Sequence, residues 1–306
     1  MKLSVVTTMY NSEEYVAEFY ERMVKSVKKI TGSYEIIFVN DGSPDGSLQI
    51  AKRLLEIDNK IRIIDLSRNF GQHKAIMTGL AHAGGDLVFL IDCDLEEDPE
   101  LLELFLEEYR RDGDADVIFG VQKNRKGNII RRLPGALFYH LFNFLSDYKL
   151  PSNLTTVRLM SKRYVENLVR YRESELVIGG LWVITGFRQV PVPIDTRHKG
   201  ASSYSFTKKM SLFFNSVTSF TSKPLVYICY IGFFISIISF ISVCYLIIVR
   251  ILYGTPILGY TSLIASIWLL GGIVIFSIGV VGVYLSRVFI EVKQRPYTII
   301  RKIYER

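Results

Sequence analysis

The sequence is poor in cysteine, and the few that occur follow no regular spacing. Only three are present in 306 residues, Cys93, Cys229 and Cys244. The N-terminus also lacks the succession of charged, apolar and small residues that marks a cleaved secretory signal. We therefore expect the globular part of the chain to stay in a reducing compartment.

Two common nucleotide-binding signatures are absent as well. There is no GxxxxGK[ST] phosphate loop, and no GxGxxG follows the first predicted strand. Kinase, ATPase and dehydrogenase functions therefore lose support. A net charge of +7 could indicate nucleic acid, but basic residues also collect beside membranes and near anionic substrates, so their location decides. Here many of them flank apolar segments, and we expect no nucleic-acid partner.

Hydrophobic sequence is present in excess. The hydrophobic content of 49% and the mean hydropathy of +0.23 exceed what one ordinary soluble domain needs. Residues Leu225–Val249 and Thr261–Leu285 carry no charged side chain, and each stretch is long enough to cross a bilayer as a helix. Glycines permit close contact between helices in lipid, and the second stretch contains Gly271, Gly272, Gly279 and Gly282. We predict a two-helix transmembrane hairpin; the alternative is a pair of buried core helices.

Basic residues on either side of this hairpin predict its orientation. Lys208, Lys209 and Lys223 precede it, and Arg287, Lys293, Arg295, Arg301, Lys302 and Arg306 follow it. The turn at residues 250–260 carries a single basic residue, Arg250. By the positive-inside tendency, both flanks lie in the cytoplasm and the turn lies outside. We expect a multi-pass protein of the inner (plasma) membrane, with its N-terminal domain and C-terminus cytoplasmic.

The first part of the chain alternates between strand-like and helix-like patterns. Strands are predicted at Leu3–Thr8, Glu35–Val39, Ile61–Leu66, Leu87–Ile91 and Asp116–Val121. Helices are predicted from Ser12 to Ile30, and near Gly46–Ile57, Lys74–Ala83 and Pro99–Arg111. Such alternation predicts an α/β domain with a mostly parallel sheet and helices on both faces. Ligands of such sheets sit beyond the carboxyl ends of the strands.

Polar residues follow the predicted strands at those ends. Tyr10 and Asn11 follow the first strand, Asp41 follows the second, and Asp92 and Asp94 follow the fourth. The two carboxylates of the Asp92-Cys93-Asp94 triplet point to the same side if the chain is extended. Carboxylate oxygens suit Mg²⁺ or Mn²⁺, which can in turn hold a diphosphate. A solvated turn is the alternative explanation of the triplet.

Several segments together resemble glycosyltransferase family 2, which has the GT-A fold, and in particular its polyprenyl-phosphate sugar transferases. That group includes dolichol-phosphate-mannose synthase and the undecaprenyl-phosphate formamido-arabinose transferase. The resemblance extends over almost the whole chain. It rests on VVTTMYNSEE (5–14), VNDGSPDGS (39–47), LSRNFGQHKAIMTGL (66–80), DCDLEEDPE (92–100), VRLMSKR (157–163), HKGASSYS (198–205) and VVGVYLSRVFIEVKQRP (280–296).

The resemblance implies roles for the polar residues at the strand ends. Nucleotide-binding residues would be Tyr10, Asn11, Asp41, Lys74 and Asp92. Asp94 would hold a Mg²⁺ or Mn²⁺ ion on the diphosphate and count as catalytic, with Glu96 as a further metal ligand. The family usually has Gln in place of Glu96, so we expect strict metal dependence. Alternatively, Asp41 stabilises an Asx-type turn; for His73 we favour a helix N-terminal role over ligand contact.

Two amphipathic stretches suggest that the acceptor is reached at a membrane surface. They span residues 129–146 and 206–220, and packing against the domain explains either one alone. A lipid phosphate would meet basic side chains there, and its candidate partners are Arg131, Arg132, Arg158 and Arg197. Arg132 and Arg158 are also assigned as catalytic. Alternatively, Arg131 and Arg132 are only basic residues that lie beside the membrane on its cytoplasmic side.

The chain departs from the family at two positions near this acceptor site. Relatives commonly have Asp-Phe-Arg where this chain has Thr156, Val157 and Arg158, so a candidate base is missing. A phosphate monoester is already largely ionised at neutral pH and needs no strong base, so the loss mildly favours a phosphate over a hydroxyl acceptor. Ser203 stands where many relatives have Lys, which leaves Lys199 as an unproven substitute.

The sequence thus predicts inverting, metal-dependent transfer of a sugar from a nucleotide-sugar, UDP-linked by preference, to a polyprenyl phosphate. The expected parts are a catalytic domain (1–203), an interfacial helix (204–223), a transmembrane hairpin (224–286) and a basic cytoplasmic tail (287–306). Two alternatives stay open: transfer to a lipid or glycan hydroxyl, and an inactive sugar-nucleotide-binding scaffold. Family members can assemble, and a homo-oligomer is also left open.

Overall fold

The computed structural model describes residues 1–122, 154–173, 178–196, 223–253 and 259–306. The chain divides into two compact units. Among the described residues, one is an α/β unit that contains residues 1–122, 154–173, 178–196 and 295–306, and the other is a helical unit within 223–294. Each unit is described by itself.

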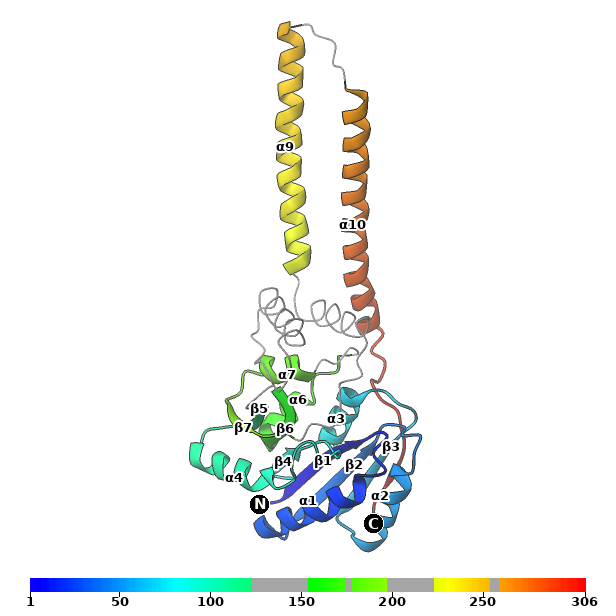
Figure 1. Cartoon of the computed structure of the whole chain (residues 1–306), viewed down its shortest axis with the longest axis vertical. Coiled ribbons are helices and arrows are strands. Elements are labelled where there is room, and N and C mark those ends of the chain that lie inside the picture. The colour runs from blue at the N-terminus through cyan, green and yellow to red at the C-terminus, as the bar shows by residue number, and fades with distance from the viewer. Residues whose placement is uncertain (123–153, 174–177, 197–222, 254–258) are drawn as a thin grey trace. The chain divides into compact units, whose positions relative to one another are not determined.

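An eight-stranded sheet forms the centre of the α/β unit, with the strand order β7-β5-β6-β4-β1-β2-β3-β8 (Figure 1). The strands are β1 (Leu3–Met9), β2 (Tyr34–Asn40), β3 (Ile61–Leu66), β4 (Leu87–Leu90), β5 (Val117–Gln122), β6 (Leu154–Ser161), β7 (Gln189–Ile194) and β8 (Ile300–Tyr304). Strand β1 lies parallel to β2 and β4, β2 to β3, and β5 to β7. Strand β6 is antiparallel to β4 and β5, and β8 to β3.

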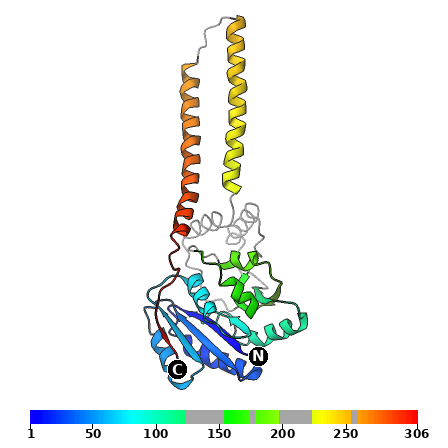
Figure 2. The ribbon, with the colours of Figure 1, turned by 180° about the vertical axis from the view of Figure 1, so that it is seen from behind.

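Helices cover both faces of this sheet (Figures 1 and 2). They are α1 (Val16–Ile30), α2 (Ser47–Ile57), α3 (Gln72–Ala81), α4 (Leu101–Asp112), α6 (Lys162–Leu168) and α7 (Ile178–Ile184). On one face, Phe19 of α1 meets Phe38 edge to face, with ring centroids 6.1 Å apart. On the other, Gly79 lets α3 approach closely, since a Cβ there would lie 2.5 Å from Val6 and 2.9 Å from Val39.

The predicted α/β fold, a mostly parallel sheet with helices on both faces, is confirmed. Most boundaries of the predicted elements shift by one or two residues, and the largest difference is that the first helix begins at Val16 rather than Ser12. The Ser12 hydroxyl instead accepts the Tyr10 N–H at 3.1 Å, and the Ser12 carbonyl accepts the N–H of Tyr15. Ser12 therefore closes the turn that follows β1, one turn ahead of the helix.

Strand β8 was not foreseen in the sequence. Residues 287–306 read as a basic tail, yet Ile300–Tyr304 pairs with β3 at the edge of the sheet. Arg301, Lys302 and Ile303 are exposed, so the strand shows no clean alternation of apolar and polar residues. Its side chains therefore gave little sign that this segment belongs to the α/β unit.

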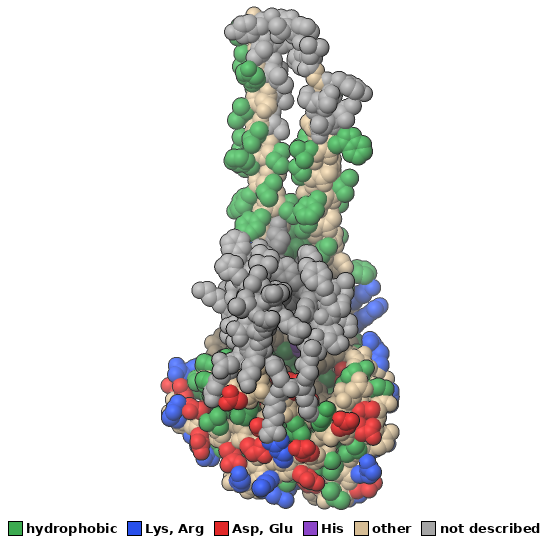
Figure 3. All heavy atoms as spheres, in the orientation of Figure 1, with side chains coloured by type: hydrophobic (Ala, Val, Ile, Leu, Met, Phe, Trp, Pro, Cys, Tyr) green, Lys and Arg blue, Asp and Glu red, His purple; other side chains and the backbone are tan. Residues whose placement is uncertain are grey.

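The helical unit holds the two long apolar helices that the sequence predicts, α9 (Lys223–Tyr253) and α10 (Tyr260–Val292). Their windows Leu225–Ser242 and Ser266–Val292 have mean hydropathies of 2.2 and 2.3, and neither is buried in the protein. Figure 3 shows hydrophobic side chains distributed over both helices. This exposure argues against buried core helices, and both helices are long and apolar enough to cross a membrane. Their orientation and the predicted segment boundaries stay predictions.

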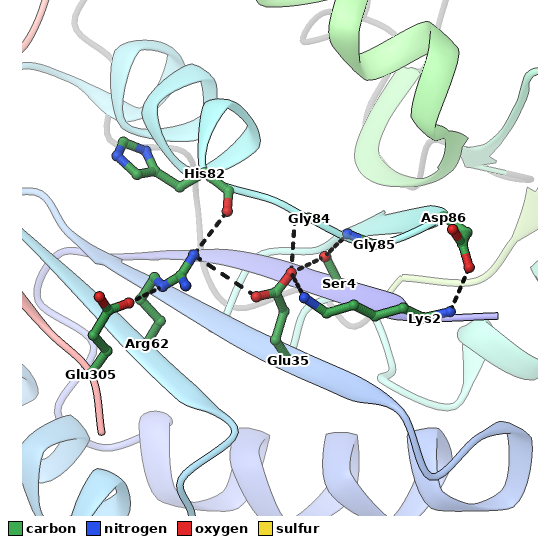
Figure 4. A network of polar contacts seen from close by, with 9 residues as sticks. All are labelled: Lys2, Ser4, Glu35, Arg62, His82, Gly84, Gly85, Asp86 and Glu305. Atoms are coloured by element: carbon green, nitrogen blue, oxygen red, sulfur yellow. Dashed lines mark hydrogen bonds and ion pairs between the residues drawn. The ribbon is translucent and has the colours of Figure 1, made fainter.

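The amino ends of the central strands are joined by a buried carboxylate, Glu35 of β2 (Figure 4). Its Oε1 atom accepts hydrogen bonds from the Ser4 hydroxyl at 2.6 Å and the Gly84 N–H at 2.8 Å, and lies 3.2 Å from the Lys2 Nζ. Burial alone would raise the pKa of Glu35, but the hydrogen bonds from Ser4 and Gly84 and the charge of Lys2 lower it.

This lowered pKa gives a prediction for the pH dependence of stability. A carboxyl whose pKa is lower in the folded state stabilises the fold above its unfolded pKa, and that contribution is lost as the pH falls through the folded pKa. We expect Glu35→Gln to lower the unfolding temperature near neutral pH, and the gap from wild type to close below about pH 4. Thermal unfolding across a pH series measures this. Glu107→Gln, at an exposed position of α4, is the control; a gap that stays constant with pH would contradict the account.

Candidate functional site

The candidate site lies at the carboxyl ends of β4, β1, β2 and β3, which are neighbours in the sheet and mutually parallel. The loops that follow these strands therefore meet along one edge. They contain residues 10–12, 41–43, 67–71 and 92–96. Tyr10, Asn11, Asp41, Asp92, Asp94 and Glu96, all predicted site residues, lie in these loops.

Asp41 ties the loop after β2 to the loop after β3. The residue is 2% exposed, and its Oδ1 and Oδ2 accept the N–H groups of Phe70 at 2.7 Å and Gly71 at 3.0 Å. Burial raises the pKa of Asp41 although these hydrogen bonds act to lower it. The Asx-type turn belongs to its neighbour Asn40, whose Oδ1 accepts the Ser43 N–H at 3.2 Å. Asp41 therefore organises the edge of the site, and its contact with a nucleoside stays a prediction.

Tyr10 and Asn11 are exposed at the end of β1. Asn11 has a φ of 51°, in the left-handed region that asparagine tolerates better than most residues. Its N–H donates to the Ser43 Oγ at 2.8 Å, which joins this loop to the loop after β2. The two side chains are thus accessible to a ligand at the predicted position.

Gly42 allows the loops after β2 and β3 to touch. Its φ is +63°, and a Cβ at this position would lie 2.4 Å from the Arg68 carbonyl carbon and 2.5 Å from the Asn69 nitrogen. We expect Gly42→Ala to push these loops apart and to raise the KM for the predicted nucleotide ligand about tenfold, because the clash adds to the cost of a positive φ. Gly113→Ala is a matched control, since Gly113 has a φ of +75° but open space around it. Equal kinetics for the two variants would contradict this explanation.

Asp92 is held by Gln72, a residue that the sequence did not assign to the site. The Gln72 Nε2 donates to the two carboxylate oxygens at 2.9 and 3.0 Å. Burial, followed by the charge of Asp94, raises the pKa of Asp92 to about 6. Gln72 lies within the family-like segment RNFGQHKAIM, so only that resemblance could have pointed to it. Lys74, predicted to bind the nucleotide, lies in the first turn of the same helix, α3.

Asp94 and Glu96 lie in a tight turn directly after Asp92. Leu95 between them is buried with a φ of 60°, which is unusual for a leucine, and the Glu96 N–H donates to the Asp94 Oδ1 at 3.0 Å. Burial and the charges of Asp92, Asp94 and Glu96 raise the pKa of neighbouring Glu97 to about 8. The turn therefore places several carboxyl groups close together.

The carboxylates of this turn offer oxygen atoms, which are the ligands that Mg²⁺ and Mn²⁺ prefer. Within the described residues, no group of three or more His, Cys, Asp or Glu side chains is arranged so that it could hold a metal ion. Mg²⁺ usually binds through one or two carboxylates together with substrate phosphates, so an all-protein cage is not needed. Asp94 and Glu96 stay the predicted ligands.

Arg158 is fully buried in β6, where it pairs with Leu90 of β4 and Phe119 of β5. Its guanidinium lies over the Trp182 ring and donates to the Thr155 and Thr156 carbonyls at 3.2 Å. Its Nη1 has no hydrogen-bond partner within the described part of the chain. Burial lowers the pKa of Arg158 to about 9.

Arg158 pairs with Leu90, which lies two residues before Asp92, and its contact with an acceptor phosphate stays a prediction. The other predicted acceptor residues, Arg131, Arg132 and Arg197, lie outside the described residues. The same holds for Lys199, Ser203 and the amphipathic stretches 129–146 and 206–220.

Comparison with known proteins identifies the family. The model of "Glycosyl transferase family 2" matches residues 4–169. A Mycobacterium tuberculosis protein whose name places it among glycosyltransferases is 55% identical, over 99% of this chain and 89% of the relative. The bactoprenol glucosyl transferase of Shigella phage SfII is 35% identical, over 99% of this chain and 98% of the relative.

A solved structure supports the fold. Mannosyl-3-phosphoglycerate synthase from Rubrobacter xylanophilus superposes with a TM-score of 0.52 at 13% sequence identity, over 71% of this chain and 72% of the other. At that identity the likeness concerns the fold alone. The family model and the full-length relatives together show that this chain belongs to glycosyl transferase family 2 and is a glycosyltransferase.

Proposed function

We propose that this glycosyltransferase transfers a sugar from a nucleotide-sugar to a polyprenyl phosphate such as undecaprenyl phosphate, at the cytoplasmic face of the membrane. The observation that carries the proposal is the full-length similarity to bactoprenol glucosyl transferases. Relatives of that name from Shigella phages SfII and SfV are 35% and 34% identical over 98% or more of both chains. The similarity therefore includes α9 and α10 as well as the sheet.

The donor is bound at the carboxyl edge of the sheet, by the residues already predicted from the family pattern. Tyr10 and Asn11 are exposed there, and Asp41 fixes the adjacent loop. We propose a UDP-linked donor and, from the names of the relatives, glucose as the sugar to test first.

A divalent cation, Mg²⁺ or Mn²⁺, would neutralise the charge that develops on the departing diphosphate. Asp94 would hold it, with Glu96 as a further ligand. The concentration of carboxylates at residues 92–97 supports this role, since their mutual repulsion is relieved by a cation. Asp92, held by Gln72, would orient the nucleotide beside it.

The acceptor would attack as an ionised phosphate. Its oxygen displaces the nucleoside diphosphate from the anomeric carbon, in line and with inversion, so the sugar gains a bond to phosphate and the diphosphate leaves with the bonding electron pair. Thr156 offers no carboxylate that could act as a base. A phosphate that is already ionised needs no base, whereas a hydroxyl would. Arg131, Arg132, Arg158 and Arg197 are the proposed partners of the phosphate oxygens.

The proposed arrangement in the membrane follows the charge pattern of the sequence. Residues 1–203 form the cytoplasmic catalytic domain, 204–223 an interfacial helix, 224–286 the hairpin and 287–306 a cytoplasmic segment. The exposed apolar windows of α9 and α10 support the hairpin. The orientation would be tested by labelling cysteines introduced in the 250–260 turn and at the C-terminus from either side of the membrane.

The activity is tested with the full chain in proteoliposomes. Labelled UDP-glucose, other UDP-sugars, GDP-mannose and dTDP-sugars are each incubated with undecaprenyl phosphate, with and without Mg²⁺ or Mn²⁺. We expect lipid-extractable label with one donor and only when a cation is present. No lipid-linked product with any donor would overturn the proposal.

A further inference from the structure

Strand β8 is attached to the carboxyl end of β3 by polar contacts as well as by strand pairing. The Arg301 guanidinium donates to the Ser67 carbonyl at 2.6 Å and reaches the Asp65 Oδ2 at 3.4 Å. The Ser67 N–H donates to the Ile299 carbonyl at 2.9 Å. This end of β8 therefore lies beside the edge of the sheet where the loops of the candidate site meet.

Asp65 connects Arg301 to the loop after β2. It is 1% exposed, and its Oδ1 accepts the Asn40 Nδ2–H at 2.7 Å. Asn40 precedes Asp41 directly and also holds the Ser43 N–H. The two oxygens of one buried carboxylate thus join Arg301 to the residue next to Asp41.

A second set of contacts connects residues 298–301 to the candidate site, through the loop after β3 and through α3. Ser67 opens the segment whose Phe70 and Gly71 N–H groups bind Asp41. The Thr298 hydroxyl lies 2.8 Å from the Thr78 hydroxyl of α3, the helix whose first residue, Gln72, holds Asp92. Residues 298–301 therefore contact both the loop that binds Asp41 and the helix that holds Asp92, the two carboxylates proposed to serve the donor nucleotide.

The opposite end of β8 has its own anchor, remote from the donor edge. The Glu305 Oε2 accepts from the Arg62 Nε at 2.6 Å, and Arg62 also donates to the His82 carbonyl at 3.1 Å (Figure 4). Because β8 is antiparallel to β3, this ion pair lies at the amino end of β3. The strand is thus held at both ends, and only the Arg301 end adjoins the site.

We propose that Arg301 is a positioning residue for the donor nucleotide, acting through Asp65 and Asn40 and through the loop that begins at Ser67. The inference rests on the proposed function only in that the carboxyl edge of the sheet binds a nucleoside diphosphate. Loss of the guanidinium leaves the buried Asp65 carboxylate without its cation and frees the Ser67 carbonyl. The segments on both sides of Asp41 then lose a common support.

The test is nucleotide binding by the full chain in nanodiscs, measured by calorimetry with UDP, GDP and dTDP in the presence of Mg²⁺. We expect Arg301→Ala to weaken the binding of the preferred nucleotide about tenfold, the scale of a lost hydrogen bond to a charged group. Arg301→Lys should restore part of the affinity, since it keeps the charge but not both hydrogen bonds.

Glu305→Gln is the matched control, because it removes the charge from the ion pair that anchors the other end of the same strand. We expect it to lower the unfolding temperature about as much as Arg301→Ala, by the small amount that is typical of exposed ion pairs. The nucleotide affinity should stay within about twofold of wild type. Equal affinities for Arg301→Ala and wild type, or equal losses in Arg301→Ala and Glu305→Gln, would overturn the inference. If Arg301→Ala fails to fold, Arg301→Lys and Thr298→Val are measured instead, and unchanged affinity in both overturns it.

The inference and the proposed function fail separately. A wild-type chain that binds UDP but makes no lipid-linked sugar refutes the proposed acceptor and leaves the role of Arg301 intact. Lipid-linked product together with a wild-type affinity in Arg301→Ala refutes the role of Arg301 alone. A wild-type chain that binds none of the three nucleotides overturns both.

Discussion

Asp94→Asn is expected to lower the rate of sugar transfer at saturating donor by about 10²- to 10³-fold, the scale of losing one group that stabilises transition-state charge. Asp94 follows Asp92 in a turn crowded with carboxylates, and a cation held there would neutralise the leaving diphosphate. The amide keeps the size of the side chain and removes its charge. The rate is measured at several Mg²⁺ and Mn²⁺ concentrations, and the variant should need more cation for its residual activity.

Asp114→Asn provides the control for this substitution. Asp114 is exposed in the turn before β5, so the same chemical change should leave the rate within about twofold of wild type, as for most surface substitutions. Both variants should unfold at nearly the wild-type temperature. A wild-type rate in Asp94→Asn would show that Asp94 does not serve the diphosphate.

Asp41→Ala is expected to raise the KM for the sugar nucleotide about 100-fold. The side chain accepts the N–H groups of Phe70 and Gly71, and its loss leaves two backbone donors without their partner near the loop after β3. That loop leads directly into Gln72, which holds Asp92, so one substitution disturbs both proposed nucleotide carboxylates. Asp41→Asn retains one acceptor oxygen and should have an intermediate KM.

Asp58→Ala is the matched control for Asp41→Ala. Asp58 also accepts a backbone N–H, from Lys60 at 2.9 Å, but it precedes β3 at the amino edge of the sheet. It should cost stability without changing the KM for the sugar nucleotide. An unchanged donor KM in Asp41→Ala, or an equal change in both variants, would contradict the role assigned to Asp41.

The sequence predicted the central part of the fold because its pattern is strong there. In β2 (Tyr34–Asn40) every residue is buried, which is typical of a parallel strand covered by helices on both faces. Strand β8 was missed because pairing with β3 is a long-range event that leaves Arg301 and Lys302 exposed. The compact α/β unit therefore includes residues 295–306, which read as a tail in the sequence.

For the candidate site, the sequence pointed to positions along the chain and not to the contacts that those residues make. Asp41 and Asp92 were predicted because each follows a strand, and parallel neighbouring strands bring their carboxyl ends to one edge of the sheet. Their partners could not be inferred, because Asp41 binds backbone N–H groups of another loop and Asp92 binds Gln72 from α3. Arg158 shows the same limit: no strand was predicted where it lies in β6, and its burial against Trp182 depends on tertiary packing.

The choice between a phosphate and a hydroxyl acceptor tests the account most directly. Full-length enzyme in proteoliposomes is given labelled UDP-glucose and cation with either undecaprenyl phosphate or undecaprenol, and the lipid product is analysed by mass spectrometry. We expect product only with undecaprenyl phosphate, carrying one hexose and retaining its single phosphorus as a phosphodiester. Sugar attached to undecaprenol at a comparable rate, or no product from undecaprenyl phosphate, would contradict the account.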